Sequence, residues 1–177
     1  RVHSGVATVG REVVLHTAQH FNWVCLGGSI KHPEAGQRMD LSQSTNETSG
    51  LKDSSVFIYP VDGYGSQELI RQLIEMEKPD ALMLITDPRY FIHIFQIENE
   101  IRRKIPIAYL NIWDDYPALL YNKAFYESCD ALLAISKQTK HAQFKNLTST
   151  RFKFVLCASP RRANALCLSR MGTTLFK

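Results

Sequence analysis

One apolar segment of this chain ends in side chains that can bind or transfer a proton. Residues 105–117 read IPIAYLNIWDDYP, so Asn111, Trp113 and Asp114 follow directly after an apolar run. Asn111 can donate and accept hydrogen bonds, and Asp114 can accept one from a hydroxyl group or act as a general base. Trp113 offers a flat apolar face of the kind on which sugar rings stack. The alternative interpretations are core packing for Trp113 and helix capping for Asp114.

Two other apolar segments have the same layout. Tyr64 lies between two glycines after residues 56–60, and Asp87 and Arg89 follow residues 81–86. Arg89 could hold a phosphate or carboxylate with two hydrogen bonds, while Asp87 orients it; alternatively, Asp87 caps a helix and pairs with Arg89. The carboxyl ends of parallel strands meet at one edge of a sheet, which is where open α/β folds bind ligands. We therefore predict a polar edge that contains all of these side chains.

A further candidate site lies near the start of the chain. In SGVATVGRE, residues 4–12, Gly5 precedes a helical pattern that includes Thr8. Free N–H groups at a helix start can hold an anion, and Gly5 would allow a close approach. A plain turn into the helix is the alternative, because neither a phosphate-loop nor a dinucleotide fingerprint is present.

The spacing of apolar residues and of turn residues predicts the elements that hold these groups. We expect helices over residues 6–20, 66–77, 88–104, 117–128 and 137–145, strands over residues 23–26, 56–60, 81–86, 105–110 and 131–135, and a polar loop over residues 29–55. Pro88 suits a first helical turn, and Ser136 suits a helix cap.

The alternation of strands and helices predicts an α/β fold, a Rossmann-like parallel sheet with helices on both faces. A strand normally leads into the first helix of such a domain, and here that helix starts almost at the first residue. We therefore expect that the first strand is missing and that the chain is a fragment. Residues 1–146 would form the domain, and residues 147–177 an atypical basic tail or a frame-shifted end, with a strand within residues 152–158.

Composition excludes several classes of protein. The four Cys are scattered and the six His lack metal-ligand spacing, so we predict no metal site. No apolar run approaches the length of a membrane span, and no signal peptide is visible. These features favour a cytoplasmic protein, with peripheral membrane contact left open.

Charge is unevenly distributed along the chain. Residues 131–177 hold 9 of the 21 Lys and Arg and no acid, a net charge of +9, whereas residues 1–130 hold the other 12 together with all 17 Asp and Glu, a net charge of −5. A basic end can bind nucleic acid or an anionic membrane surface. A solvated tail is favoured, because the region lacks a repeated basic and aromatic pattern.

Five segments carry a family resemblance: SGVATVGRE (4–12), GGSIKHP (27–33), KPDALMLITDPRY (78–90), IPIAYLNIWDD (105–115) and YESCDALLAISKQT (126–139). In the last, Asp130, Ser136 and Thr139 have the spacing D-x-x-x-x-x-S-x-x-T. Together the segments resemble the amino-terminal domain of a GT-B glycosyltransferase of the retaining family 4 type. The resemblance covers about residues 4–141.

The resemblance implies that this half holds the acceptor and that an absent carboxyl-terminal domain binds the nucleotide-sugar donor, without a resident cofactor. No acid follows Asp130, so we expect the chain alone to be inactive. Many members of the family carry a His just past the strand expected here over residues 105–110. This chain has Asn111, Ile112 and Trp113 at that place instead. The catalytic candidate is Asp114, and the candidates for donor or acceptor binding are Gly5, Thr8, Tyr64, Asp87, Arg89, Asn111 and Trp113.

The expected partners are a nucleotide-sugar, a sugar, lipid or protein acceptor, and the second domain. Two other classes remain open. One is a non-catalytic nucleotide- or sugar-binding module, and the other is a nucleic-acid or membrane-surface binder that uses the basic tail. A dehydrogenase is disfavoured by the absence of the glycine fingerprint.

Overall fold

The structure is a computed structural model that describes residues 5–28, 31–112, 119–146, 155–157 and 174–176. The helices are α1 (Gly5–Thr17), α2 (Ser42–Ser49), α3 (Gln67–Glu77), η1 (Pro88–Phe91), α4 (Ile92–Phe95), α5 (Glu98–Arg102), η2 (Leu120–Asn122), α6 (Lys123–Glu127) and α7 (Lys137–Asn146). The strands are β1 (Trp23–Gly27), β2 (Met39–Asp40), β3 (Val56–Pro60), β4 (Ala81–Ile85), β5 (Ile107–Asn111), β6 (Ala131–Ala134), β7 (Val155–Cys157) and β8 (Thr174–Phe176).

The strands of the described residues form one sheet in the order β2-β3-β1-β8-β4-β5-β6-β7. β1 pairs parallel with β3, and β4, β5, β6 and β7 pair parallel with one another. β2 and β8 run antiparallel to their neighbours. The predicted α/β fold with a largely parallel sheet is confirmed.

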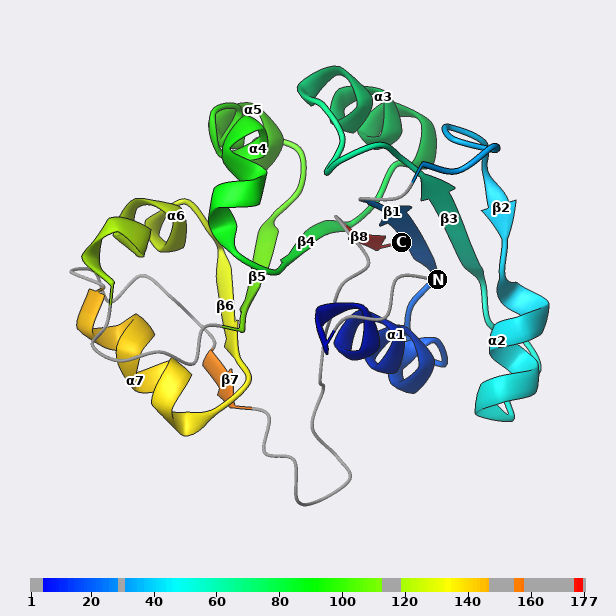
Figure 1. Ribbon diagram of the computed structural model, residues 1–177, viewed down its shortest axis with the longest axis horizontal. Coiled ribbons are helices and arrows are strands. Elements are labelled where there is room, and N and C mark those ends of the chain that lie inside the picture. Colours follow the sequence, from blue (N-terminus) through cyan, green and yellow to red (C-terminus); the bar gives the residue numbers. More distant parts are fainter. Residues whose placement is uncertain (1–4, 29–30, 113–118, 147–154, 158–173, 177) are drawn as a thin grey trace.

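Helices cover both faces of the sheet, as predicted. Figure 1 shows α1 on one face and α3, α4 and α5 on the other. Side chains of a strand alternate between faces, so Val24 and Leu26 join the core under α3, whereas Trp23 and Cys25 join the core under α1. Burial on both faces explains why the strands are almost continuously apolar.

The prediction of one long loop over residues 29–55 is wrong, because the segment contains β2 and α2. Helix α2 is polar, and it is held by side-chain contacts rather than by an apolar stripe. The Ser42 hydroxyl accepts from Val56 N–H (3.1 Å), and the Asn46 side chain bonds Lys52 O (3.1 Å) and Ser54 N–H (3.0 Å). Gly50 ends the helix with φ +72.

The single helix expected over residues 88–104 is instead divided into η1, α4 and α5. Ile97 N–H donates to Ile94 O (3.0 Å), a tight turn that interrupts the α-helical pattern. The helix expected over residues 117–128 is likewise shorter; its described part forms η2 and α6. In α3, the N-cap Ser66 accepts from Leu69 N–H (3.2 Å).

Two strands come from the region expected to be a tail. β7 lies within the strand expected over residues 152–158 and pairs with β6, and β8 pairs with β1 and β4 in the middle of the sheet. A domain division at residue 146 and a missing first strand both stay predictions.

Asp130 and Ser136 lie at opposite ends of β6. Asp130 accepts hydrogen bonds from the Arg102 guanidinium (2.8 and 3.1 Å) and from Ile107 N–H (2.8 Å), so it ties α5 to the starts of β5 and β6. Ser136 accepts from Thr139 N–H (3.0 Å) and caps α7, as predicted. Asp130 therefore supports the fold at the end of the sheet away from the predicted site.

We expect Asp130→Asn to lower the free energy of unfolding by about 1–3 kcal/mol, because hydrogen bonds to a charged group are lost. Urea denaturation measures the change. Asp80→Asn is the matched control, since Asp80 precedes β4 in the same way but is exposed and makes no ion pair with a described residue. Equal effects of the two changes would contradict this role.

Candidate functional site

The loops that follow β1 and β3 pack against each other at the carboxyl end of the sheet. A Cβ atom on Gly28 would lie 2.5 Å from the carbonyl oxygen of Gly63, so the two backbones approach as closely as only glycine allows. Val61 N–H also donates to Gly27 O (2.9 Å). Gly63 and Gly65 have φ +63 and +83, which places Tyr64 on a tight turn.

Tyr64, in the loop after β3, reaches the segment that follows β4, the next strand along the chain. Its ring stacks on Tyr90 with centroids 4.6 Å apart and meets the buried Phe91 edge to face at 5.7 Å. Tyr90 itself is 48% exposed. Tyr64 therefore lies against η1, which contains Arg89 and is capped by Asp87, as the predicted common edge requires.

Asp87 and Arg89 form a closed local unit. The Asp87 carboxylate accepts from Arg89 N–H (2.9 Å) and from Arg89 Nε (2.9 and 3.0 Å), and the guanidinium also lies 5.6 Å from the ring centroid of Tyr121. The capping and ion-pair interpretation of Asp87 is confirmed. Burial raises the pKa of Asp87, but the hydrogen bonds from Arg89 outweigh it and hold that pKa below its usual value.

Thr86, directly before Asp87, has an unusual backbone. Its φ of +111 lies where non-glycine residues are strained, and the residue is buried. The Tyr109 hydroxyl donates to Thr86 O (2.8 Å) from β5, and burial raises the pKa of Tyr109 well above its usual value. The hydroxyl of the buried Tyr109 thus fixes the strained backbone of Thr86, directly before Asp87.

Asn111 is buried rather than presented to a ligand. Its Nδ2 donates to the Tyr126 hydroxyl (2.9 Å), which also accepts from Asn122 Nδ2 (3.4 Å). Burial raises the pKa of Tyr126, so this hydroxyl stays neutral. The three side chains join β5 to α6, and Asn111 is 1% exposed.

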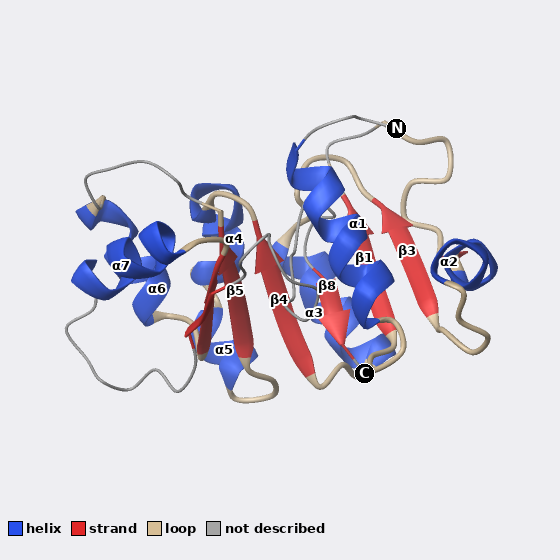
Figure 2. Cartoon of the chain, turned by 90° about the horizontal axis from the view of Figure 1, so that it is seen from below, coloured by secondary structure: helices blue, strands red, loops and turns tan. Residues whose placement is uncertain are grey.

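The other predicted site residues divide into two groups. Gly5 and Thr8 are exposed in the first turns of α1, which begins at the end of the molecule toward which β1 and β3 point (Figure 2). No atom lies within 4 Å of a Cβ built on Gly5, so no described neighbour demands glycine there. Trp113 and Asp114 lie outside the described residues.

His93 on α4 is a site neighbour that sequence reasoning missed. It forms a hydrogen bond with the backbone of Tyr64, and its Nε2 is buried without a partner. Burial lowers the pKa of His93 more than this hydrogen bond raises it. A lone His on a helix carries no sequence signal for this contact, which needs the loop after β3 to lie beside α4.

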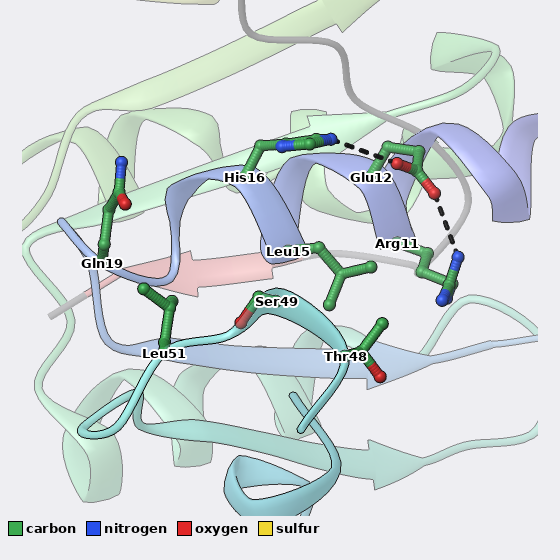
Figure 3. Close-up of a pocket in the computed structure, with 8 residues that line it drawn as sticks. All are labelled: Arg11, Glu12, Leu15, His16, Gln19, Thr48, Ser49 and Leu51. Atoms are coloured by element: carbon green, nitrogen blue, oxygen red, sulfur yellow. Dashed lines mark hydrogen bonds and ion pairs between the residues drawn. The ribbon is translucent and has the colours of Figure 1, made fainter. Parts of the chain in front are cut away.

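A separate groove lies between α1 and α2 (Figure 3). Arg11, Glu12 and His16 form its polar side, with Glu12 bonded to Arg11 (3.0 Å) and paired with His16 (3.3 Å). Its other walls come from the end of α2 and from Leu51, which precedes β3. The groove therefore lies toward the amino end of the strands and contains none of the predicted site residues.

The described residues contain no group of three His, Cys, Asp or Glu placed to hold a metal ion. Likewise, none of the helices in the described part is long and apolar enough to cross a membrane. Comparison of the chain with protein-family models, with curated proteins and with solved structures found no match.

We expect Thr86→Gly to be more stable than Thr86→Ala by about 1 kcal/mol, since both remove the side chain but only glycine tolerates the positive φ. Guanidinium denaturation of the two variants tests this. Ala81→Gly in the extended part of β4 is the control, where glycine should instead destabilise. A Thr86→Ala variant as stable as Thr86→Gly would remove the inferred strain.

His93→Gln should make folding less sensitive to acid. The folded pKa of His93 is lowered, so below the unfolded value of about 6.5 the unfolded chain binds the proton more readily and stability falls with pH. Gln can keep a hydrogen bond to the Tyr64 backbone but does not titrate. We expect the loss in melting temperature between about pH 7.5 and about pH 5.5 to be smaller in the variant; an equal loss would refute the role of His93.

Proposed function

We propose that this chain is the acceptor-binding half of a GT-B glycosyltransferase of the family 4 type, an enzyme that moves a sugar from a nucleotide-sugar to an acceptor. Two findings support the proposal: the five sequence segments that resemble this family, and a largely parallel sheet whose loops after β1, β3 and β4 gather at one edge.

The observation that carries the proposal is the stacked pair Tyr64 and Tyr90 beside the ion pair Asp87 and Arg89. One face of Tyr90 rests on Tyr64 while about half of the residue stays exposed, which leaves an apolar ring surface for the C–H groups of a sugar. The adjacent carboxylate and guanidinium can bond its hydroxyls. A flat apolar surface with a few fixed polar groups is the usual construction of a small-ligand site.

Asp87 suits binding rather than proton transfer. Its lowered pKa keeps it ionised near neutral pH, so it accepts hydrogen bonds but is a weak base. In the proposed reaction, an acceptor hydroxyl oxygen bonds to the anomeric carbon, the nucleoside diphosphate leaves, and a base takes the hydroxyl proton. We assign that base to Asp114 and the donor contacts to a carboxyl-terminal domain.

A non-catalytic sugar-binding module is the second candidate. Two observations favour it: the Asn111 amide is buried against Tyr126, and the Asp87 carboxylate is already paired with Arg89. The described side chains of this edge are held in fixed positions by these partners, which suits the binding of a ligand more than its chemical conversion. The hypothesis of a basic tail that binds nucleic acid or membrane concerns residues that lie mostly outside the described part.

Binding to a glycan array tests the site. We expect the chain to bind a subset of glycans, and Tyr90→Ala to weaken this binding at least about fivefold, because the exposed ring surface is lost. Met76→Ala is the matched control, since Met76 is exposed on α3 and outside the candidate site. Absence of glycan binding, or equal binding by Tyr90→Ala and the parent chain, would overturn the proposal.

Turnover separates the two candidate functions. Incubation of the chain with a bound glycan and uridine or guanosine diphosphate sugars should give no product, whereas the chain joined to a donor-binding GT-B domain should release nucleoside diphosphate and extend the glycan. Glycan binding without product in the joined protein would establish the binding module instead.

A further inference from the structure

Tyr121 lies beside the candidate site but comes from a later part of the chain. It belongs to η2, and the guanidinium carbon of Arg89 in η1 lies 5.6 Å from the centre of its ring. Tyr90 is the next residue after Arg89 in η1. The pKa of Arg89 is raised most by Asp87 and, to a smaller extent, by the phenol groups of the two tyrosines. Tyr90 and Tyr121 therefore both lie near the ion pair of Arg89 with Asp87.

Both tyrosines are held from one side and open to solvent on the other. Tyr90 stacks on Tyr64, and Tyr121 meets the Arg89 guanidinium. About half of each residue stays exposed, 48% of Tyr90 and 51% of Tyr121. The surface thus presents two aromatic rings with a charged pair beside both.

The turn that carries Tyr121 is anchored in the interior. The next residue, Asn122, is 1% exposed, and its side chain donates to the buried Tyr126 hydroxyl (3.4 Å). Asn122 N–H donates to Leu119 O (3.1 Å), which closes the turn. An exposed ring on an anchored turn loses little conformational entropy when a ligand covers it.

A second contact fixes the two turns relative to each other. α4 directly follows η1, and α6 directly follows η2. The rings of Phe95 in α4 and Phe125 in α6 pack together with their centroids 4.9 Å apart. Tyr90 and Tyr121 are therefore placed by two helices that touch, and their relative position is set before any ligand binds.

The chemistry of this surface matches a chain of sugars better than a protein or a membrane. The centre of a protein interface is depleted in charged residues, whereas here an ion pair lies beside both rings. Each sugar ring has a face of C–H groups and a rim of hydroxyl groups. Two linked sugars can lay one C–H face on each tyrosine, while hydroxyl groups near the linkage bond to Arg89 and Asp87.

We propose that Tyr121 forms a second sugar subsite, so that the substrate class of the site is an oligosaccharide of at least two linked sugars. One sugar stacks on Tyr90, and the adjoining sugar stacks on Tyr121. This inference rests on the glycan binding proposed above, and it adds the length of the glycan that the site recognises.

Binding to glycans of increasing length tests the second subsite. The probes are glucose, mannose, galactose and N-acetylglucosamine, each as one, two and three linked sugars. We expect the full chain to bind at least one two-sugar probe at least about fivefold more tightly than its single sugar, because a second ring is covered. Equal affinity for one, two and three sugars would overturn this proposal and leave the proposed function standing. If none of these probes binds, this proposal is overturned, and the full glycan array decides the proposed function separately.

Variants of Tyr121 assign the gain in affinity to its ring. Tyr121→Ala should lose the gain from the second sugar, whereas Tyr121→Phe should keep it, since the ring remains. Leu120→Ala is the matched control, because Leu120 is the adjacent residue and is 73% exposed but has no ring. The gain is a ratio of two affinities of the same variant, so a change in the amount of folded protein does not affect it. A gain that persists in Tyr121→Ala, or that is lost in Leu120→Ala, would contradict the subsite.

Saturation-transfer NMR locates the second sugar directly. In a bound disaccharide, the C–H protons of both sugars should receive saturation from the parent chain and from Tyr121→Phe, but those of only one sugar from Tyr121→Ala. The same pattern in all three proteins would refute the subsite.

Uridine diphosphate and guanosine diphosphate are the competing probes, because a nucleotide base also stacks on aromatic rings. We expect neither to displace the disaccharide from the chain. Displacement that depends on Tyr121 would assign its ring to a nucleotide base and overturn the proposal.

Discussion

Parallel pairing of strands that are buried on both faces is the constraint on which the molecule depends. Because β1, β3, β4, β5 and β6 all run in one direction, the residues that follow them leave the sheet at the same edge. The loops have little freedom there, and they pack directly: Gly28 against Gly63, and Tyr64 against Tyr90. The candidate site is therefore a consequence of strand direction, and its aromatic and charged groups come from loops that are distant in the sequence.

Buried tyrosines connect this edge to the interior. Tyr109 bonds the carbonyl of Thr86, and Tyr126 accepts from Asn111, so two hydroxyls hold the tips of β4 and β5. In an apolar core each hydroxyl is strongly bound to its partner, since an unpaired polar group there is costly. The bond from Tyr109 explains how the strained residue Thr86 can precede Asp87 while the Asp87 carboxylate keeps a fixed orientation. Through its hydrogen bond to Tyr126, Asn111 is part of the scaffold of the site.

The centre of the sheet and the candidate site are joined through the backbone. β4 pairs with β8 through Ala81–Met83, and the residues that follow β4 are Thr86 and Asp87; β1 pairs with β8 through Trp23–Cys25 and ends at Gly27, before Gly28. The two strands that flank the antiparallel β8 thus lead into Asp87 and into the contact between Gly28 and Gly63.

The sequence by itself determined what depends on near neighbours. The periodicity around β3 and α3, the capping by Ser136, and the pairing of Asp87 with Arg89 were all predictable, because each involves groups a few residues apart. The α/β class and the common position of Tyr64 and Asp87 followed from the alternation of strands and helices.

Only the tertiary structure decided the remainder. The burial of Asn111, the positive φ of Thr86, the contact of His93 with Tyr64 and the place of β8 all depend on partners remote in the sequence. A polar residue after a strand looks the same in a sequence whether it meets solvent or a buried hydroxyl. Its environment is set by which distant backbone packs beside it, and local patterns carry no information about that.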